Sequence, residues 1–163
     1  MSDKYVTFKN VSGKDIWYKN FSGRPTKYIP DGGKRTFTVV FDDIELARMM
    51  AADGWTVRFR YIDGEEEPST ASLEIKVRYN DNNPSRNPNI TQGTRRGDPV
   101  RLDEESVGGL DYVDILEATY VTVRGWEYET GKRSAYLVRA SFIIDECLDS
   151  YRDVDMGDED LPF

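Results

Sequence analysis

The chain has 163 residues, enough for one domain with an extension but short for two domains. It contains no histidine and a single cysteine, which excludes histidine-dependent catalysis, an internal disulfide and a cysteine-ligated zinc site. The net charge of −8 is concentrated at one end, because residues 145–163 hold eight acids and one base while residues 1–144 are nearly neutral.

The chain begins with patterns of short strands. Residues 6–8 and 16–18 alternate as strands do, and 12–15 between them contain the Ser-Gly-Lys-Asp signal of a turn, which predicts an N-terminal hairpin. Residues 20–35 are rich in Gly, Pro and Lys and predict a loop. No apolar run is long enough for a membrane span or a leader peptide, so we expect a cytoplasmic protein, in the host cytoplasm if it is phage-encoded.

A strand and a helix follow the loop. Residues 36–40 predict a strand. Asp42 or Asp43 can cap a helix whose apolar residues recur at helical spacing, and Gly54 ends it. The apolar residues of this helix are Ile44, Leu46, Ala47, Met50 and Ala51.

The clearest hairpin in the sequence joins residues 55–61 to residues 73–79. Apolar and aromatic residues alternate with polar ones in both segments, so each strand has a core face and a solvent face. The expected core face of the first strand consists of Trp55, Val57, Phe59 and Tyr61. The expected solvent face brings four cations together, namely Arg58, Arg60, Lys76 and Arg78.

The rest of the chain adds a long polar loop and two strands. Residues 80–99 predict a loop containing Arg95 and Arg96, and residues 103–107 predict a short helix. Residues 113–128 predict a long strand or a bent pair of strands with a bulge at Gly125, and residues 134–144 predict the last strand. Many short strands with one or two short helices indicate an all-β fold, and a five-stranded OB barrel over residues 1–144 suits the length.

Cations and aromatic rings are interleaved along these strands, as single-stranded nucleic acid binding requires. Cations follow the phosphates and rings stack on bases. The four clustered cations could equally be ordinary surface, Trp126 could close one barrel end, and Arg95 and Arg96 could belong to a mobile loop. The candidate DNA-binding residues are Trp17, Lys19, Arg58, Arg60, Lys76, Arg78, Arg95, Arg96, Tyr120, Arg124 and Trp126.

Residues 145–163 predict a flexible acidic tail. Residues 153–163 contain several acids and no base, a composition that keeps a chain extended. The tail nevertheless ends in three apolar residues, which suit a hydrophobic pocket with a basic rim on a partner protein. The candidate partner-binding tip consists of Asp158, Glu159, Asp160, Leu161, Pro162 and Phe163.

This tip resembles the C-terminus of bacterial single-stranded-DNA-binding proteins, in which acids precede a final Ile/Leu-Pro-Phe. Here only residues 145–152 separate it from the last strand, in place of the long Gly/Gln/Pro-rich linker of the bacterial form. Stretches of the body resemble bacteriophage-encoded single-stranded-DNA-binding proteins of OB fold, namely residues 8–11, 19–23, 54–57 and 102–107. The resemblance implies a non-catalytic protein that protects single-stranded DNA during replication or recombination, with a tip that recruits replication and repair proteins.

Two other classes of function remain open at this stage. The protein could be an acidic DNA mimic that inhibits a host nuclease, although a mimic would carry its acids on the folded body. Acid pairs such as Asp42-Asp43 could hold Mg²⁺ in principle, but helix capping and solvated surface explain them far better. We therefore expect no enzyme activity, no cofactor and no metal. The oligomeric state stays undetermined.

Overall fold

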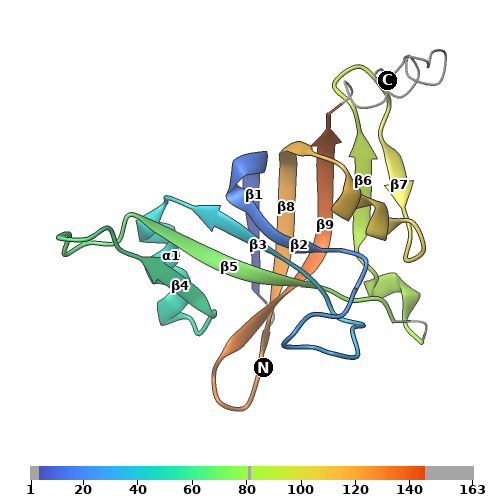
Figure 1. Cartoon of the computed structure of the whole chain (residues 1–163). Helices are drawn as coiled ribbons and strands as arrows, with labels where there is room; N and C mark the ends of the chain where they lie inside the picture. The colour runs from blue at the N-terminus through green and yellow to red at the C-terminus, as the bar shows by residue number, and fades with distance from the viewer. Residues whose placement is uncertain (1–3, 81, 146–163) are drawn as a thin grey trace.

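The computed structural model describes residues 4–80 and 82–145, and β-strands are the predominant secondary structure of this part (Figure 1). No helix within these ranges is long and apolar enough to cross a membrane. In chain order the elements are β1 (Lys4–Ser12), η1 (Gly13–Asp15), β2 (Ile16–Asn20), β3 (Arg35–Phe41), α1 (Ile44–Ala52), β4 (Val57–Arg60), β5 (Thr70–Val77), η2 (Pro84–Arg86), β6 (Asn89–Gly93), β7 (Val100–Leu102), η3 (Val107–Tyr112), β8 (Ile115–Glu127) and β9 (Arg133–Ile144).

Five long strands close into a barrel because the first of them is bent. β1 pairs antiparallel with β8, with Lys4 opposite Gly125, whereas β2 pairs antiparallel with β3. The short turn η1 joins β1 to β2, so the two form one bent strand whose halves pair with opposite edges of the sheet β8-β9-β5-β3. Because the same bent strand pairs with the first and the last strand of this sheet, the sheet closes into a barrel.

The remaining pairings give this barrel OB topology. β8 and β9 are antiparallel, β9 runs parallel to β5, and β5 is antiparallel to β3. The predicted five-stranded OB barrel is confirmed. The predicted N-terminal hairpin is wrong, because residues 12–15 bend the chain, so that β1 pairs with β8 and β2 pairs with β3. A side chain at Gly13 would collide with the carbonyl group of Ile115, so the bend lies tightly against β8.

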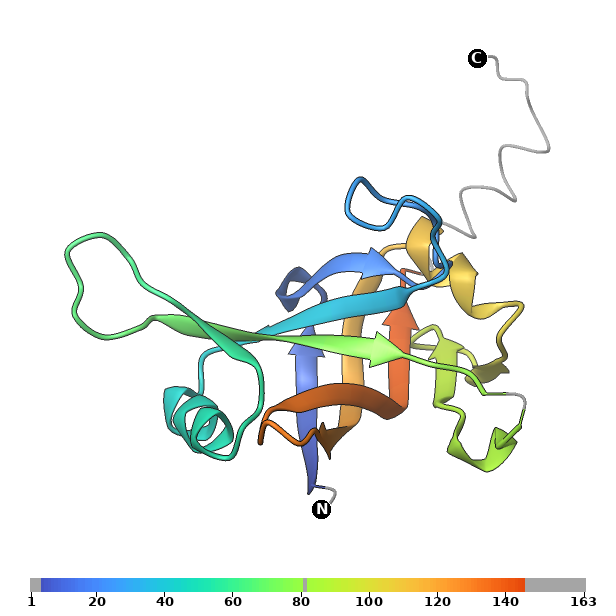
Figure 2. The ribbon, with the colours of Figure 1, turned by 90° about the horizontal axis from the view of Figure 1, so that it is seen from below.

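The predicted helix and hairpin between β3 and β5 are confirmed. The carboxylate of Asp43 accepts a hydrogen bond from the backbone nitrogen of Leu46 (3.1 Å) and begins α1, and Gly54 follows its end with φ +94°. β4 pairs with β5, and the connection between them extends far from the barrel (Figure 2). Because β4 is short and peripheral, only part of its predicted core face is covered: Trp55 is buried, Val57 and Phe59 are half-buried, and Tyr61 is exposed.

The segment between β5 and β8 differs from the prediction. β6 lies inside the predicted loop 80–99 and runs parallel to β9, with a single buried apolar residue, Ile90, and therefore no alternating pattern. Residues 103–106 form a turn, because the Asp103 carboxylate accepts hydrogen bonds from the backbone of Glu105 and Ser106, and helical structure begins only at Val107 with η3. The irregularities of β8 lie before Arg124 and not at Gly125.

The core lies inside the barrel and is centred on three phenylalanine rings. Phe21 stacks on Phe37 with ring centroids 5.1 Å apart, and Phe142 meets the two rings edge-on at 5.6 and 6.0 Å. These rings come from the end of the bent strand, from β3 and from β9, so their packing holds three parts of the barrel wall together.

Arg133 ties the base of the β8–β9 hairpin to the end of α1. Its side chain is only 3% exposed. Nε donates to the carbonyl oxygen of Asp53 (2.9 Å) and Nη1 donates to that of Gly125 (3.1 Å). Trp55 packs directly on Gly125, where a Cβ atom would lie 2.6 Å from the indole. Gly125 is therefore required by this contact, and the buried cluster fixes the hairpin from which the candidate site projects.

Candidate nucleic-acid interface

Two hollows form on the outside of the barrel where a strand changes its neighbour. β3 occupies one edge of β5 along its whole length. The other edge pairs with β4 along residues 70–73 and with β9 at residues 75–76, so Glu74 lies at the change. β9 in turn pairs with β5 at residues 135–136 and with β6 at residues 139–143. Between two such paired stretches none of the described strands covers the edge, so a hollow forms there that is lined by side chains of the outer face.

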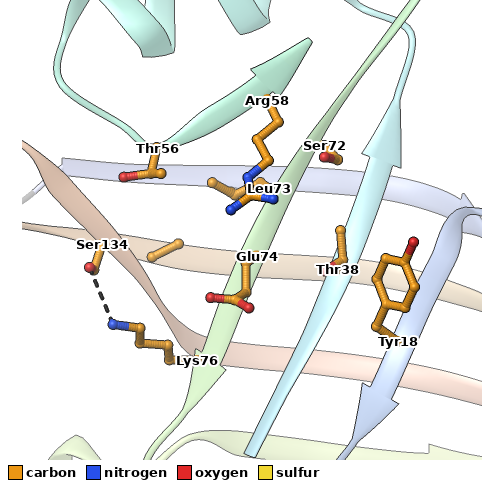
Figure 3. A pocket seen from close by; sticks show the side chains of 10 residues that line it. Tyr18, Thr38, Thr56, Arg58, Ser72, Leu73, Glu74, Lys76 and Ser134 are labelled. Carbon is orange, nitrogen blue, oxygen red and sulfur yellow. Dashed lines mark hydrogen bonds between the residues drawn. The ribbon is translucent and has the colours of Figure 1, made fainter. Parts of the chain in front are cut away.

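We call the first hollow the junction pocket. It has a volume of about 330 Å³ and contains hydroxyl groups, two cations and one carboxylate (Figure 3). In Figure 3, Arg58 reaches toward β5 from β4, and the Lys76 ammonium points to Ser134, whose Oγ it meets at 3.4 Å. Its lining residues are Tyr18, Thr38, Thr56, Arg58, Ser72, Leu73, Glu74, Lys76, Ser134 and Ala135.

We call the second hollow the aromatic groove. It has a volume of about 540 Å³ and combines four aromatic rings with three arginines. No carboxylate lines it among the residues that the structure describes. Its lining residues are Tyr5, Arg78, Asn80, Ser85, Arg86, Asn87, Arg124, Trp126, Tyr128, Tyr136, Leu137 and Val138.

Tyr136 is the centre of the aromatic groove because three cations surround its ring. The Nζ atom of Lys76 lies 5.7 Å from the ring centroid, and the guanidinium carbons of Arg78 and Arg124 lie at 6.0 and 5.8 Å. Arg124 also lies 5.9 Å from the ring of Trp126. Lys76 lines the junction pocket and also contacts the Tyr136 ring, so this residue connects the two hollows.

A hydrogen bond between two tyrosines orients the rings of the groove. The hydroxyl oxygens of Tyr128 and Tyr136 are 3.1 Å apart. Burial, followed by this hydrogen bond, raises the pKa of Tyr136, whereas hydrogen bonds from Ser134 and then Tyr136 lower the pKa of Tyr128. The bond restricts rotation of two side chains whose flat faces could stack on bases.

The structure brings together seven of the candidate residues, five in the two hollows and two at the rim of the junction pocket. Arg58 and Lys76 line the junction pocket, and Arg78, Arg124 and Trp126 line the aromatic groove. Trp17 and Arg60 lie at the rim of the junction pocket, where the Trp17 ring contacts Tyr18 and the Arg60 guanidinium lies 5.9 Å from that ring.

The expected cluster of four adjacent cations is not observed. Arg58 is opposite Ser72 and Arg60 is opposite Thr70, so both are several residues away from Lys76 along β5. All four side chains do share the outer face, but they divide between the Trp17 rim, the junction pocket and the aromatic groove.

The other candidate residues lie elsewhere. Lys19 donates hydrogen bonds to the carbonyl oxygens of Leu110 (2.9 Å) and Val113 (2.7 Å), and burial lowers its pKa, so it fastens β2 to η3 instead of facing a ligand. Arg95 forms an ion pair with Glu117 (3.2 Å), and Arg96 follows it in the β6–β7 loop. Tyr120 is opposite Ser141, four residues before Arg124. The partner-binding tip, residues 158–163, lies outside the described residues.

Several residues of the site were not identified from the sequence. Tyr136 could have been found, because Ala135 and Leu137 alternate with it and mark the opposite side of the strand as the core. Tyr128 and Arg86 lie in a turn and in a short 3-10 helix, and Tyr18 has φ +57°, so no strand periodicity places them.

Comparison with known proteins identifies one matching family model, described as "Putative phage ssDNA-binding domain", over residues 2–162. No curated protein matches the chain. Among solved structures, the chain is similar to the single-stranded DNA-binding protein of bacteriophage Enc34 in complex with ssDNA, with 12% identity, 87% of each chain covered and a TM-score of 0.49. A C-terminal truncation of the same protein matches with 12% identity, the same coverage and a TM-score of 0.46.

Proposed function

Because this chain belongs to the phage single-stranded-DNA-binding family, whose model spans residues 2–162, it binds single-stranded DNA, and we propose that the strand lies along the aromatic groove and the junction pocket. In this proposal the arginines and Lys76 neutralise phosphates while Trp126 and Tyr136 stack on bases. Such contacts tolerate any sequence, because every base has a flat face. The family is one of binding domains, in agreement with the expectation of a non-catalytic protein.

The observation that carries this proposal is the group of three cations around the Tyr136 ring. Like charges this close repel each other, so an anionic partner that enters between them lowers the electrostatic energy. The aromatic groove has no acid among its described lining residues, so a phosphate would meet only attraction there. A DNA mimic would present carboxylates at its binding surface, and this composition argues against that alternative.

The salt dependence of binding tests the role of the cations. We expect the triple variant Lys76→Ala, Arg78→Ala, Arg124→Ala to bind oligo-dT more weakly at low salt. The slope of log affinity against log salt should become less steep by about 2, because each contacted phosphate contributes about 0.7. Titrations of a fluorescent oligo-dT at several salt concentrations measure both quantities.

A variant with the same change in charge provides the control. Lys9, Lys14 and Arg48 are exposed cations outside the two hollows, and their replacement by alanine should leave the slope nearly unchanged. If the folded triple variant and the wild type show the same slope of log affinity against log salt, the phosphates are bound by residues other than Lys76, Arg78 and Arg124.

For the remainder of the chain we propose a division of labour. Residues 1–144 form the DNA-binding domain, and residues 145–163 form a flexible tail whose tip, residues 158–163, recruits replication or repair proteins. The support is compositional, since an acidic segment with an apolar end suits a hydrophobic pocket rimmed by bases on a partner. The protein would then act in replication or recombination in the host cytoplasm.

Removal of residues 153–163 should strengthen DNA binding by about two- to tenfold at low salt. The tail is a tethered polyanion at roughly millimolar effective concentration and competes with DNA for the cationic surface. The gain should shrink as salt screens the competition. Titration of both forms across a salt series measures it.

The single change Phe163→Ala separates recruitment from this competition. It keeps every acid, so DNA affinity should be unchanged while binding of a replication or repair partner is lost. A truncated protein that unfolds, or that binds DNA more weakly at low salt, would show that the tail belongs to the domain.

A further inference from the structure

The junction pocket contains a group that phosphate binding does not explain. Glu74 is exposed on the outer face of β5, in the middle of the pocket lining. A carboxylate repels a nearby phosphate, so a pocket that bound only the DNA backbone would be weakened by it. The neutral side of a nucleotide is its base, and the presence of Glu74 therefore favours a base at this point rather than a phosphate.

Glu74 is also placed so that it can accept hydrogen bonds from a ligand. It is opposite Thr38 of β3, and Arg58 and Lys76 line the same pocket. In Figure 3, the Glu74 carboxylate lies between these two cations, with Tyr18 on the far side of Thr38. Within residues 4–80 and 82–145, no ion pair engages Glu74 even though two cations are its neighbours.

The bases differ in how well they complement such a site. An ionised carboxylate only accepts hydrogen bonds, and its two oxygens bind best to two parallel donors. Guanine presents N1–H and the N2 amino group side by side, whereas thymine has one ring N–H and no amino group. Lysine and arginine are the usual partners of guanine O6 and N7, so the neighbours of Glu74 complement the rest of the same base.

We propose that the junction pocket is a base-reading site that prefers an unpaired guanine in the bound strand. Glu74 accepts hydrogen bonds from guanine N1–H and N2, Arg58 or Lys76 donates to O6 and N7, and Tyr18, which is 74% exposed, supplies a stacking face. This inference rests on the proposed function, because it assumes that DNA follows the two hollows. It adds a base preference to a binding mode that is otherwise independent of sequence.

The test compares three oligonucleotides of roughly 15 nucleotides, within the range that one OB fold covers. The first is oligo-dT, the second carries one central guanine, and the third carries hypoxanthine there, which lacks the N2 amino group. We expect the guanine oligonucleotide to bind about fivefold tighter than oligo-dT, the lower end of the range for a bidentate base contact. The hypoxanthine oligonucleotide should lose most of that gain.

Two variants locate the effect. Glu74→Gln should bind all three oligonucleotides alike and oligo-dT at least as well as the wild type, because one carboxylate is removed from the DNA surface. Glu66→Gln removes the same charge from the exposed β4–β5 connection and should keep the guanine preference.

Each remaining result counts against the proposal. Equal binding of the three oligonucleotides by the wild type overturns the base preference and leaves the proposed function standing. A guanine preference that survives in Glu74→Gln overturns the assignment to the junction pocket. A wild type that binds none of the oligonucleotides overturns the inference and the proposed function together.

Discussion

Replacement of both Trp126 and Tyr136 by alanine is expected to weaken binding of oligo-dT at least about 30-fold. Each base stacked on an aromatic ring contributes about 1–3 kcal/mol by alanine substitution, so two rings contribute about 2–6 kcal/mol if they act independently. A factor of ten corresponds to about 1.4 kcal/mol. Fluorescence anisotropy of a labelled oligonucleotide at a fixed salt concentration measures the loss.

Two further variants make this result specific to stacking. Tyr61 and Tyr112 are exposed outside the two hollows, and their double replacement by alanine should leave affinity unchanged. Tyr136→Leu keeps apolar volume in the groove but removes the flat ring, so it should lose affinity without loss of fold. If a folded Trp126/Tyr136 double variant binds oligo-dT with native affinity, the aromatic groove is not part of the DNA-binding site.

The change Arg133→Met is expected to lower the free energy of unfolding by about 2–4 kcal/mol. The carbonyl oxygen of Gly125 loses a buried donor and that of Asp53 a part-buried one, and an unsatisfied buried group costs about 1–3 kcal/mol. Methionine refills part of the volume, which leaves the polar loss as the main effect. Urea unfolding should show a lower midpoint with an unchanged slope.

The neighbouring residue supplies the control for this experiment. Lys132 is exposed, and Lys132→Met should leave the midpoint where it is. Arg133→Lys should recover little, because a single ammonium cannot reproduce the two directed bonds of a guanidinium. A stable Arg133→Met protein would mean that Trp55 and Gly125 hold the hairpin without the arginine.

The sequence predicts correctly those elements that depend only on neighbouring residues, such as helix caps and alternating strands. The cap at Asp43 and the apolar spacing after it mark α1 without knowledge of the rest of the fold. The alternation in residues 55–61 and 73–79 likewise identifies which faces point outward. These patterns do not predict the register in which the two strands pair. In the structure Arg58 is opposite Ser72 and not Lys76. A shift of four residues keeps every side chain on its face, so the alternation is identical in both registers.

Long-range pairing explains the remaining differences. Residues 12–15 carry turn signals whether the chain forms a hairpin or only bends, and the pairing of β1 with β8 decides between the two. β6 owes its conformation to its position beside β9, since a single buried isoleucine gives no periodicity. In the site, the strand alternation that placed Arg124 and Trp126 outward applies equally to Tyr136. The junction pocket could not be predicted, because it exists only where β4 and β9 meet along one edge of β5.

The bent first strand also has a consequence for synthesis of the protein. Lys4 pairs with Gly125, so about 120 residues must leave the ribosome before β1 meets its partner. At about 5–20 residues per second this takes roughly 6–24 s. During that interval Phe8 and Val11, which are buried in the finished barrel, lack the cover that β8 supplies. β1 of the nascent chain is therefore an apolar segment open to chaperones until β8 has emerged.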